Sequence, residues 1–107
     1  IPGALTPTEV VVAMGAGADI VKIFPAATFG PAYIKHLRGP LPDVPFLVAG
    51  GVNAKNIEAF FDAGAVVAAI GGELIDASTV AAGDWQELRK RAKIFCEIAQ
   101  RRAREER

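Results

Sequence analysis

The chain has 107 residues, with 12 basic and 12 acidic side chains and one cysteine. The zero formal net charge gives no bulk attraction to nucleic acid or to a membrane surface, and a single cysteine excludes an internal disulfide. No apolar stretch reaches the roughly 20 residues that a membrane-spanning helix needs. We therefore expect one domain, residues 1–107, without nucleic-acid or membrane partners, and Cys96 is compatible with a reducing cytoplasm.

The first predicted helix has a clear start signal. Thr6 can cap the helix, Pro7 sits at its first position, and Glu9 follows three residues after the cap. This helix should run to about residue 16 and stop at Gly17, because glycine is favoured just past a helix end. The residues before it, 1–3, read like the end of a strand.

Helices and strands then alternate along the chain. The predicted elements are a strand at 19–24, a helix at 31–37, a strand at 45–49, a helix at 53–63 capped by Asn53, and a strand at 66–70. Asp84 and Glu87 form a second capping box, which opens a long amphipathic helix. Its apolar side comprises Trp85, Leu88, Ala92, Phe95 and Ala99, and its last turns, 101–107, are expected to fray.

This alternation is typical of a parallel α/β sheet with right-handed crossovers. We expect three parallel strands side by side in chain order, with helices on one face. A weak internal repeat relates "AGADIVKI" (16–23) to "AGAVVAAI" (63–70) and sets Lys22 opposite Ala69. The repeat therefore tolerates a small apolar residue where one strand carries a lysine.

Lys22 lies in the middle of an apolar run, where an ammonium group is costly to desolvate. Strand alternation places it on the face opposite the aliphatic pair Val21 and Ile23. Two interpretations stay open. The lysine either reaches water at the end of the strand, or is partly desolvated so that its neutral amine attacks a carbonyl and forms a Schiff base. In the second interpretation, Phe24 and Pro25 keep the pocket dry.

Two glycine pairs directly follow successive strands, Gly50-Gly51 and Gly71-Gly72. Backbone N–H groups at such turns bind phosphate well, and in (β/α)8 barrels the usual phosphate site lies after the last two strands. The alternative is that the glycines only permit tight turns. On the functional interpretation, we expect the N–H groups of the two turns to converge on one anion-sized site.

Five segments together resemble the C-terminal part of the 2-keto-3-deoxy-6-phosphogluconate (KDPG) aldolases, a family that includes 4-hydroxy-2-oxoglutarate (KHG) aldolases and phosphogalactonate relatives. The segments are "IPGALTPTE" (1–9), "GADIVKIFPA" (17–26), "GPAYIKHLRGPLP" (30–42), "GGVN" (50–53) and "GGEL" (71–74). The resemblance covers the chain to about residue 95. It implies a (β/α)8 TIM barrel, usually a trimer, of which this chain holds the last three to four βα units.

The resemblance also implies an activity. The family members are class I aldolases, lyases that need no metal or other cofactor and act in carbohydrate metabolism, in the cytoplasmic Entner-Doudoroff pathway. Their small-molecule substrate is a keto-acid phosphate, KDPG, cleaved to pyruvate and glyceraldehyde 3-phosphate, or 4-hydroxy-2-oxoglutarate. Lys22 matches the Schiff-base lysine, and the phosphate-holding loops match Gly50, Gly51, Gly71 and Gly72.

The chain departs from the family pattern. Ala49 stands where a threonine is common, so a hydroxyl near the substrate pocket is lost, and Gly72 stands where a serine is often found. A full barrel needs roughly 200 residues or more, and no segment here matches the strand that carries the family's general acid/base glutamate. Glu73 and Asp76 follow a strand end, but helix capping explains them better than proton transfer.

We therefore expect the intact protein to be an aldolase and the isolated half to turn over poorly, because aldol cleavage needs a proton-transfer group. The competing hypothesis is a catalytically silent, phosphate-binding half-barrel fragment or assembly scaffold. A half-barrel exposes sheet edges and an apolar face, which favours self-association or pairing with the N-terminal half. His36 has no ligand partner at useful spacing, so no metal site is predicted.

Overall fold

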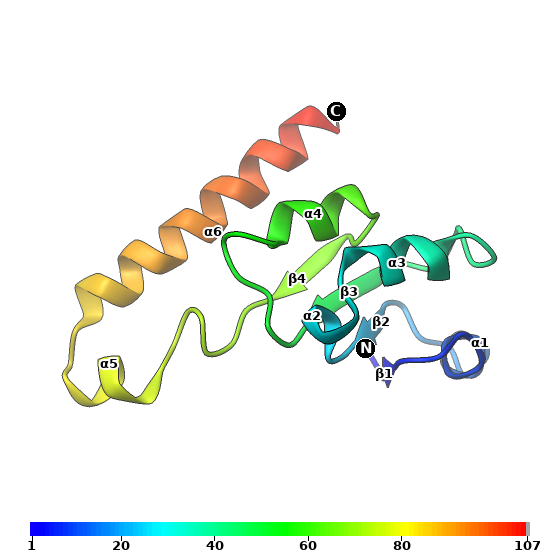
Figure 1. The fold of residues 1–107 in the computed structure, drawn as a ribbon, viewed down its shortest axis with the longest axis horizontal. Helices are drawn as coiled ribbons and strands as arrows, with labels where there is room; N and C mark the ends of the chain where they lie inside the picture. Colours follow the sequence, from blue (N-terminus) through cyan, green and yellow to red (C-terminus); the bar gives the residue numbers. More distant parts are fainter. Residues whose placement is uncertain (107) are drawn as a thin grey trace. The chain divides into compact units, whose positions relative to one another are not determined.

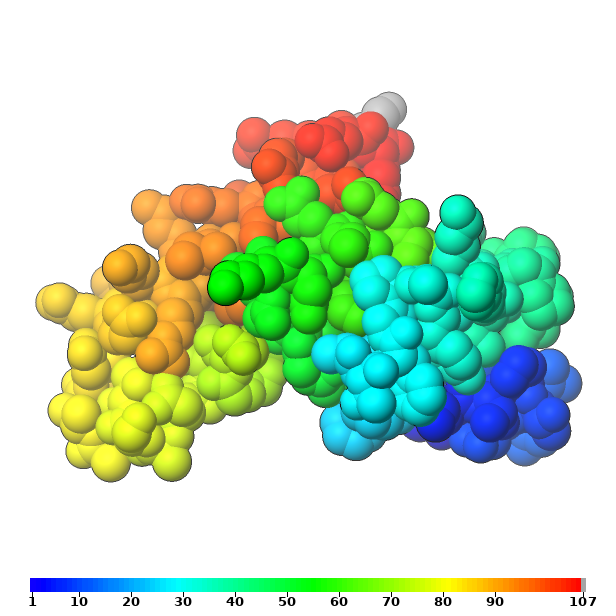
Figure 2. Space-filling model, in the orientation of Figure 1, coloured from blue at the N-terminus to red at the C-terminus, as the bar shows by residue number. Residues whose placement is uncertain are grey.

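The computed structural model describes residues 1–106, which are drawn in Figure 1. The chain divides into two compact units, Ile1–Ile70 and the residues from Gly71 onward, and each unit is described by itself. In Figure 2, the residues of the first unit, from blue to green, pack into one continuous body. None of the helices in residues 1–106 combines the length and the hydropathy that crossing a membrane requires.

The first unit is built on a four-stranded parallel sheet whose strand order follows the chain. The strands are β1 (Gly3–Ala4), β2 (Val21–Ile23), β3 (Phe46–Ala49) and β4 (Val67–Ala69). The prediction of parallel strands in chain order is confirmed, and the first residues do include the end of a strand. β2 is shorter than the predicted strand, because the chain still bends at residues 19–20.

Four helices accompany the sheet in this unit: α1 (Pro7–Gly15), α2 (Ala26–Phe29), α3 (Pro31–Arg38) and α4 (Ile57–Asp62). The start of α1 is as predicted, since the Thr6 hydroxyl oxygen accepts from the Glu9 N–H at 3.3 Å. The prediction missed α2, whose first turn has no capping side chain. The predicted start of α4 at Asn53 was wrong: Asn53 caps a separate turn, and the helix begins at Ile57.

The two faces of the sheet are covered differently. Seven of the described residues have no exposed surface, three on helices and four on one face of the central strands. The helical residues are Val10 of α1, Ile34 of α3 and Phe60 of α4, and the strand residues are Val21, Ile23, Phe46 and Val48. On the opposite face Lys22 is half-buried and Ala69 is exposed. The helices therefore seal one face of the sheet and leave Lys22 on the other.

The second unit contains α5 (Ala77–Ala81), which was not predicted, and α6 (Trp85–Glu105). The second capping box is only half formed. Asp84 accepts from the Glu87 N–H at 3.2 Å, but the Glu87 carboxylate binds Arg91 instead of returning to the cap. The predicted apolar side of α6 is not buried, since its first residue, Trp85, is 63% exposed. The helix continues to Glu105, and the expected fraying of its last turns stays a prediction; Arg107 lies outside the described residues.

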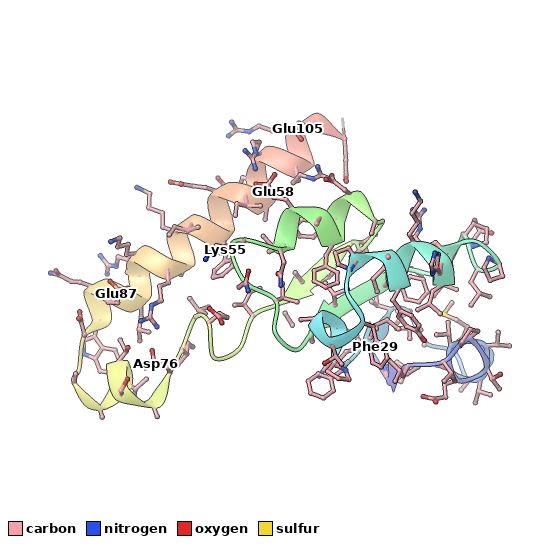
Figure 3. All side chains as sticks on the ribbon, viewed as in Figure 1. Phe29, Lys55, Glu58, Asp76, Glu87 and Glu105 are labelled. Atoms are coloured by element: carbon pink, nitrogen blue, oxygen red, sulfur yellow. The ribbon has the colours of Figure 1, made fainter. Side chains whose placement is uncertain are left out.

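A polar cluster around Asp76 joins α5 to α6. The Asp76 carboxylate accepts from the Thr79 hydroxyl at 2.6 Å, from the Ser78 hydroxyl, and from Arg91 Nη1 at 2.6 Å. Arg91 also contacts Glu87, so Asp76 and Glu87, which are both labelled in Figure 3, share one guanidinium. The hydrogen bonds from Ser78, Thr79 and Arg91 hold the pKa of Asp76 well below its ordinary value of 3.8. The expected capping role of Asp76 is confirmed.

The Asp76 cluster predicts acid sensitivity of the second unit. A carboxyl whose pKa is lowered by folding stabilises the folded state above its ordinary pKa, and this contribution is lost as the pH falls through the lowered value. We expect Asp76→Asn to speed amide hydrogen exchange at Thr79 near neutral pH and to remove most of its acid dependence. Glu97→Gln is the control, because Glu97 faces Lys93 at 3.7 Å in an exposed pair, which contributes little. Equal exchange in Asp76→Asn and the unaltered chain would contradict this account.

Candidate active site

Lys22 occupies the central position of β2, where its backbone pairs in register with Gly3 of β1 and Leu47 of β3. Its two strand neighbours, Val21 and Ile23, are fully buried on the helix-covered face. Lys22 itself is half-buried on the opposite face, as strand alternation predicts.

Phe24 follows Lys22 at the end of the strand and lies beside its amine. The Lys22 Nζ atom is 5.2 Å from the centroid of the Phe24 ring, which is cation–π range. Phe24 is 55% exposed, because its ring projects from the face that the helices do not cover. The expectation that Phe24 keeps the pocket dry stays a prediction. Pro25 is half-buried, and its peptide bond with Phe24 is cis.

An open hollow of about 420 Å³ adjoins the Lys22 side chain. Its lining residues are Ile1, Gly3, Ala4, Leu5, Glu9, Lys22 and Phe24. Two predicted pocket residues, Pro25 and Ala49, do not line it, and Ala49 is 6% exposed at the end of β3. The hollow thus brings the amine, one aromatic ring and one carboxylate to the same side of the sheet.

The carboxylate of this hollow, Glu9, is already engaged. Its Oε2 atom accepts from the Leu5 N–H at 3.0 Å, and its Oε1 atom accepts from the Thr6 hydroxyl at 3.0 Å. Both oxygens therefore serve the start of α1, and the capping role expected from the sequence is confirmed.

The turn that follows β3 needs glycine for two reasons. Gly50 and Gly51 have φ angles of +91° and +73°, a region that other residues rarely adopt. A Cβ atom on Gly50 would lie 2.8 Å from two carbons of the Phe24 ring, and one on Gly51 would lie 2.6 Å from the Ala27 Cβ. The geometry of the turn is therefore sufficient to require glycine at both positions, whether or not the turn also binds an anion.

Asparagine side chains organise the rest of this turn, and sequence reasoning missed one of them. Asn56 Nδ2 donates to the Gly51 carbonyl at 3.0 Å, and Asn56 Oδ1 accepts from the Asn53 N–H at 2.8 Å. Lys55, labelled in Figure 3, lies between the two asparagines. The spacing of three residues between Asn53 and Asn56 was the available signal, since asparagine favours local bonds to backbone.

Gly71 and Gly72, at the start of the second unit, differ from the first pair. Neither has a positive φ, and a Cβ atom on either would meet nothing within 4 Å. Local geometry in the described structure therefore gives no reason for glycine at these two positions. The expected convergence of the two glycine turns on one site stays a prediction, because it involves both units.

The described residues show no metal-binding group. Residues 1–106 contain no cluster of three or more histidine, cysteine, aspartate or glutamate side chains that could hold an ion. His36 is exposed in the last turn of α3, and Cys96 is exposed on α6.

Comparisons with known proteins identify relatives of the chain. A family model described as KDPG and KHG aldolase matches residues 1–91. The 2-dehydro-3-deoxy-6-phosphogalactonate aldolase of Escherichia coli (strain K12) is 38% identical over 100 residues, which are 92% of this chain and 49% of that protein. The 2-dehydro-3-deoxy-phosphogluconate aldolase of Pseudomonas aeruginosa is 31% identical over 91 residues, 84% of this chain and 41% of that protein.

Solved structures agree. One described as "Native KDPGal structure" superposes with a TM-score of 0.76 at 37% identity, covering 92% of this chain and 48% of that one. A cube-shaped, highly porous protein cage designed by fusing symmetric oligomeric domains superposes with a TM-score of 0.81 at 34% identity, covering 98% of this chain and 39% of that one. The chain thus spans about half the length of these two curated relatives. With a parallel α/β sheet and this match over most of its length, the chain belongs to the KDPG and KHG aldolase family.

Proposed function

We propose that the complete protein is a class I aldolase that cleaves KDPG to pyruvate and glyceraldehyde 3-phosphate through an iminium on Lys22. The observation that carries the proposal is the position of Lys22, whose side chain lines an open hollow on the face of the sheet that the helices leave uncovered. The phosphogalactonate stereoisomer and 4-hydroxy-2-oxoglutarate are the alternative substrates, since the relatives carry names of each kind.

The chemistry follows from an amine beside a keto acid. The neutral Lys22 amine attacks the C2 carbonyl, and loss of water gives an iminium that acts as an electron sink. The C3–C4 bond then breaks, its electron pair forms an enamine, and the C4 hydroxyl proton leaves to a base as the aldehyde departs. Protonation of the enamine at C3 and hydrolysis of the iminium release pyruvate and restore the amine.

The phosphate of the substrate is assigned to the glycine turns. On this proposal Gly50, Gly51, Gly71 and Gly72 present backbone N–H groups to the phosphate oxygens, which bind anions without needing a charged side chain. Holding the phosphate end fixes the distance from the carbonyl to the amine, and such positioning lowers the barrier by removing orientational freedom.

The first unit places no carboxylate beside the Lys22 amine that is available for the proton-transfer steps. Glu9 lines the same hollow as Lys22, but both of its oxygens accept hydrogen bonds at the start of α1. Asp76 caps α5 and pairs with Arg91. We therefore assign the general acid/base to a group outside residues 1–106, as the family resemblance implies.

The second candidate function is a phosphate-binding half-barrel without catalysis, and one observation favours it. Phe24 is 55% exposed, so the surroundings of the amine in this chain are wet, and a hydrated ammonium is a poor nucleophile. For catalysis, this face would have to be covered by further chain or by a neighbouring subunit.

The assembly that we propose is a homo-oligomer, a trimer as in the family, in the cytoplasm.

The Schiff-base assignment predicts a selective covalent adduct. Pyruvate followed by borohydride should add one reduced adduct to Lys22, which peptide mass spectrometry locates, and Lys22→Ala should reduce the adduct to background. Lys22→Ala should also keep its fold, because Ala69 occupies the matching position of β4. Lys55→Ala is the matched control and should retain the adduct. Labelling at Lys35 or Lys55 in place of Lys22 would refute the assignment.

The open surroundings of Gly72 predict a gain-of-binding variant. Gly72→Ser should leave the melting temperature unchanged, because the new Cβ meets nothing within 4 Å. The added hydroxyl should tighten the binding of inorganic phosphate about three- to tenfold, the worth of one solvent-exposed hydrogen bond of ordinary net strength. Gly72→Ala carries the same Cβ without the hydroxyl and should show no gain. Equal affinities of the serine and alanine variants would show that a side chain at position 72 does not reach the bound phosphate, against this prediction.

A further inference from the structure

The turn after β3 has both of its glycine carbonyls tied to the protein. The Gly50 carbonyl accepts from the Ala27 N–H of α2 at 2.9 Å. The Gly51 carbonyl accepts from Asn56 Nδ2 at 3.0 Å. One tether is backbone and belongs to the corner between β2 and α2, whereas the other is a single side chain.

A hydrogen bond that holds a carbonyl group also fixes the direction of the N–H bond of the next residue. In a planar trans peptide the C=O bond and the following N–H bond point in opposite directions. The bond from Ala27 therefore turns the Gly51 N–H away from α2, and the bond from Asn56 turns the Val52 N–H away from the Asn56 amide. Within residues 1–106 neither of these two N–H groups donates to a protein acceptor.

The Val52 N–H is the more informative of the two. Val52 is only 2% exposed, and N–H groups in buried residues nearly always have an acceptor. The next N–H along the chain, that of Asn53, is taken up by Asn56 Oδ1 at 2.8 Å. Asn56 thus accepts from the Asn53 N–H and leaves the N–H groups of Gly51 and Val52 for an acceptor outside the protein.

We propose that Asn56 is a positioning residue for substrate phosphate, which the N–H groups of Gly51 and Val52 bind. This inference rests on the proposed function for the identity of the anion. Asn56 acts through the backbone: its amide donates to one carbonyl of the turn and accepts from one N–H, so both ends of the segment 51–53 are held by one side chain. The Asn56 side chain makes no contact with the phosphate itself in this account.

Asn53 provides a matched control because its side chain serves the same loop differently. Asn53 Oδ1 accepts from the N–H groups of Lys55 and Asn56 at 2.9 and 3.0 Å. Asn53→Ala therefore removes two side-chain hydrogen bonds, as Asn56→Ala does, but leaves the Asn56 side chain in place against the Gly51 carbonyl. A merely structural role of Asn56 predicts the same phenotype for both variants.

The test titrates inorganic phosphate into the 107-residue chain and follows the amide signals of Gly51 and Val52 by NMR. We expect Asn56→Ala to raise the phosphate dissociation constant about five- to tenfold, the effect of losing one hydrogen bond of ordinary net strength that positions the turn. Asn53→Ala should change it less than about twofold. Equal losses in the two variants, or an unchanged constant in Asn56→Ala, would overturn the positioning role.

A second variant covers the case in which Asn56→Ala does not fold. Asn56→Asp keeps the acceptor for the Asn53 N–H and the size of the side chain, but its carboxylate repels the Gly51 carbonyl and the anion. Its phosphate affinity should be at least as weak as that of the alanine variant, and it should recover as the carboxyl is protonated below about pH 4. Undiminished affinity at neutral pH would refute the proposal.

Pyruvate trapping at Lys22 in the same samples separates this inference from the proposed function. Trapping needs no phosphate site, so the adduct should form equally in the unaltered chain and in Asn56→Ala. Trapping at Lys22 without phosphate shifts at Gly51 and Val52 would overturn only the positioning role. Phosphate shifts that depend on Asn56, without trapping, would support the positioning role and count only against Lys22 as a nucleophile in the 107-residue chain.

Discussion

The Phe24 ring lies against the backbone of Gly50, so closely that a Cβ atom there would come within 2.8 Å of two ring carbons. The same ring stands 5.2 Å from the Lys22 amine. One aromatic side chain therefore lies against both the Lys22 side chain on β2 and the turn after β3. A larger residue at position 50 would have to move the ring or the turn, and on the proposed function either movement would change the distance that a substrate must bridge between the amine and the turn.

The sheet supports this arrangement because one of its faces packs against the helices and the other carries Lys22. Val21 and Ile23 are completely buried under helices, which fixes β2 in register between β1 and β3. Lys22 lies between these two residues, so the backbone places its side chain on the other face and the apolar core of the described residues contains no lysine. The internal repeat makes the same point from the sequence, since β4 carries Ala69 at the matching position and still pairs in parallel. On the proposed function, folding and chemistry thus use alternate residues of the same strand.

The longer elements with strong periodicity or caps could be predicted from sequence, whereas the shortest helices could not, including α5 with its Asp76 cap. Thr6 and Asp84 marked helix starts because their side chains accept from the backbone three residues on. α2 escaped prediction because its four residues carry no cap and follow a strand directly. The face on which Lys22 lies followed from alternation, but the exposure of Phe24 did not, because exposure depends on what covers the sheet from outside. Asn56 was missed although its spacing from Asn53 was a local signal, because its second bond reaches back five residues to the Gly51 carbonyl.

The division of labour within the site follows from these contacts. An aldol cleavage needs a nucleophile, an anchor for the substrate and a proton-transfer group in one water-poor space. On the proposed function, β2 supplies the nucleophile and the turn after β3 supplies an anchor, and both are positioned by local contacts: Phe24 against Gly50, and Asn56 against Gly51. Desolvation and proton transfer are different in kind, because they require atoms on the far side of the substrate. A sheet face that leaves Phe24 half exposed can present the reacting amine, but exclusion of water and movement of protons depend on whatever packs over that face.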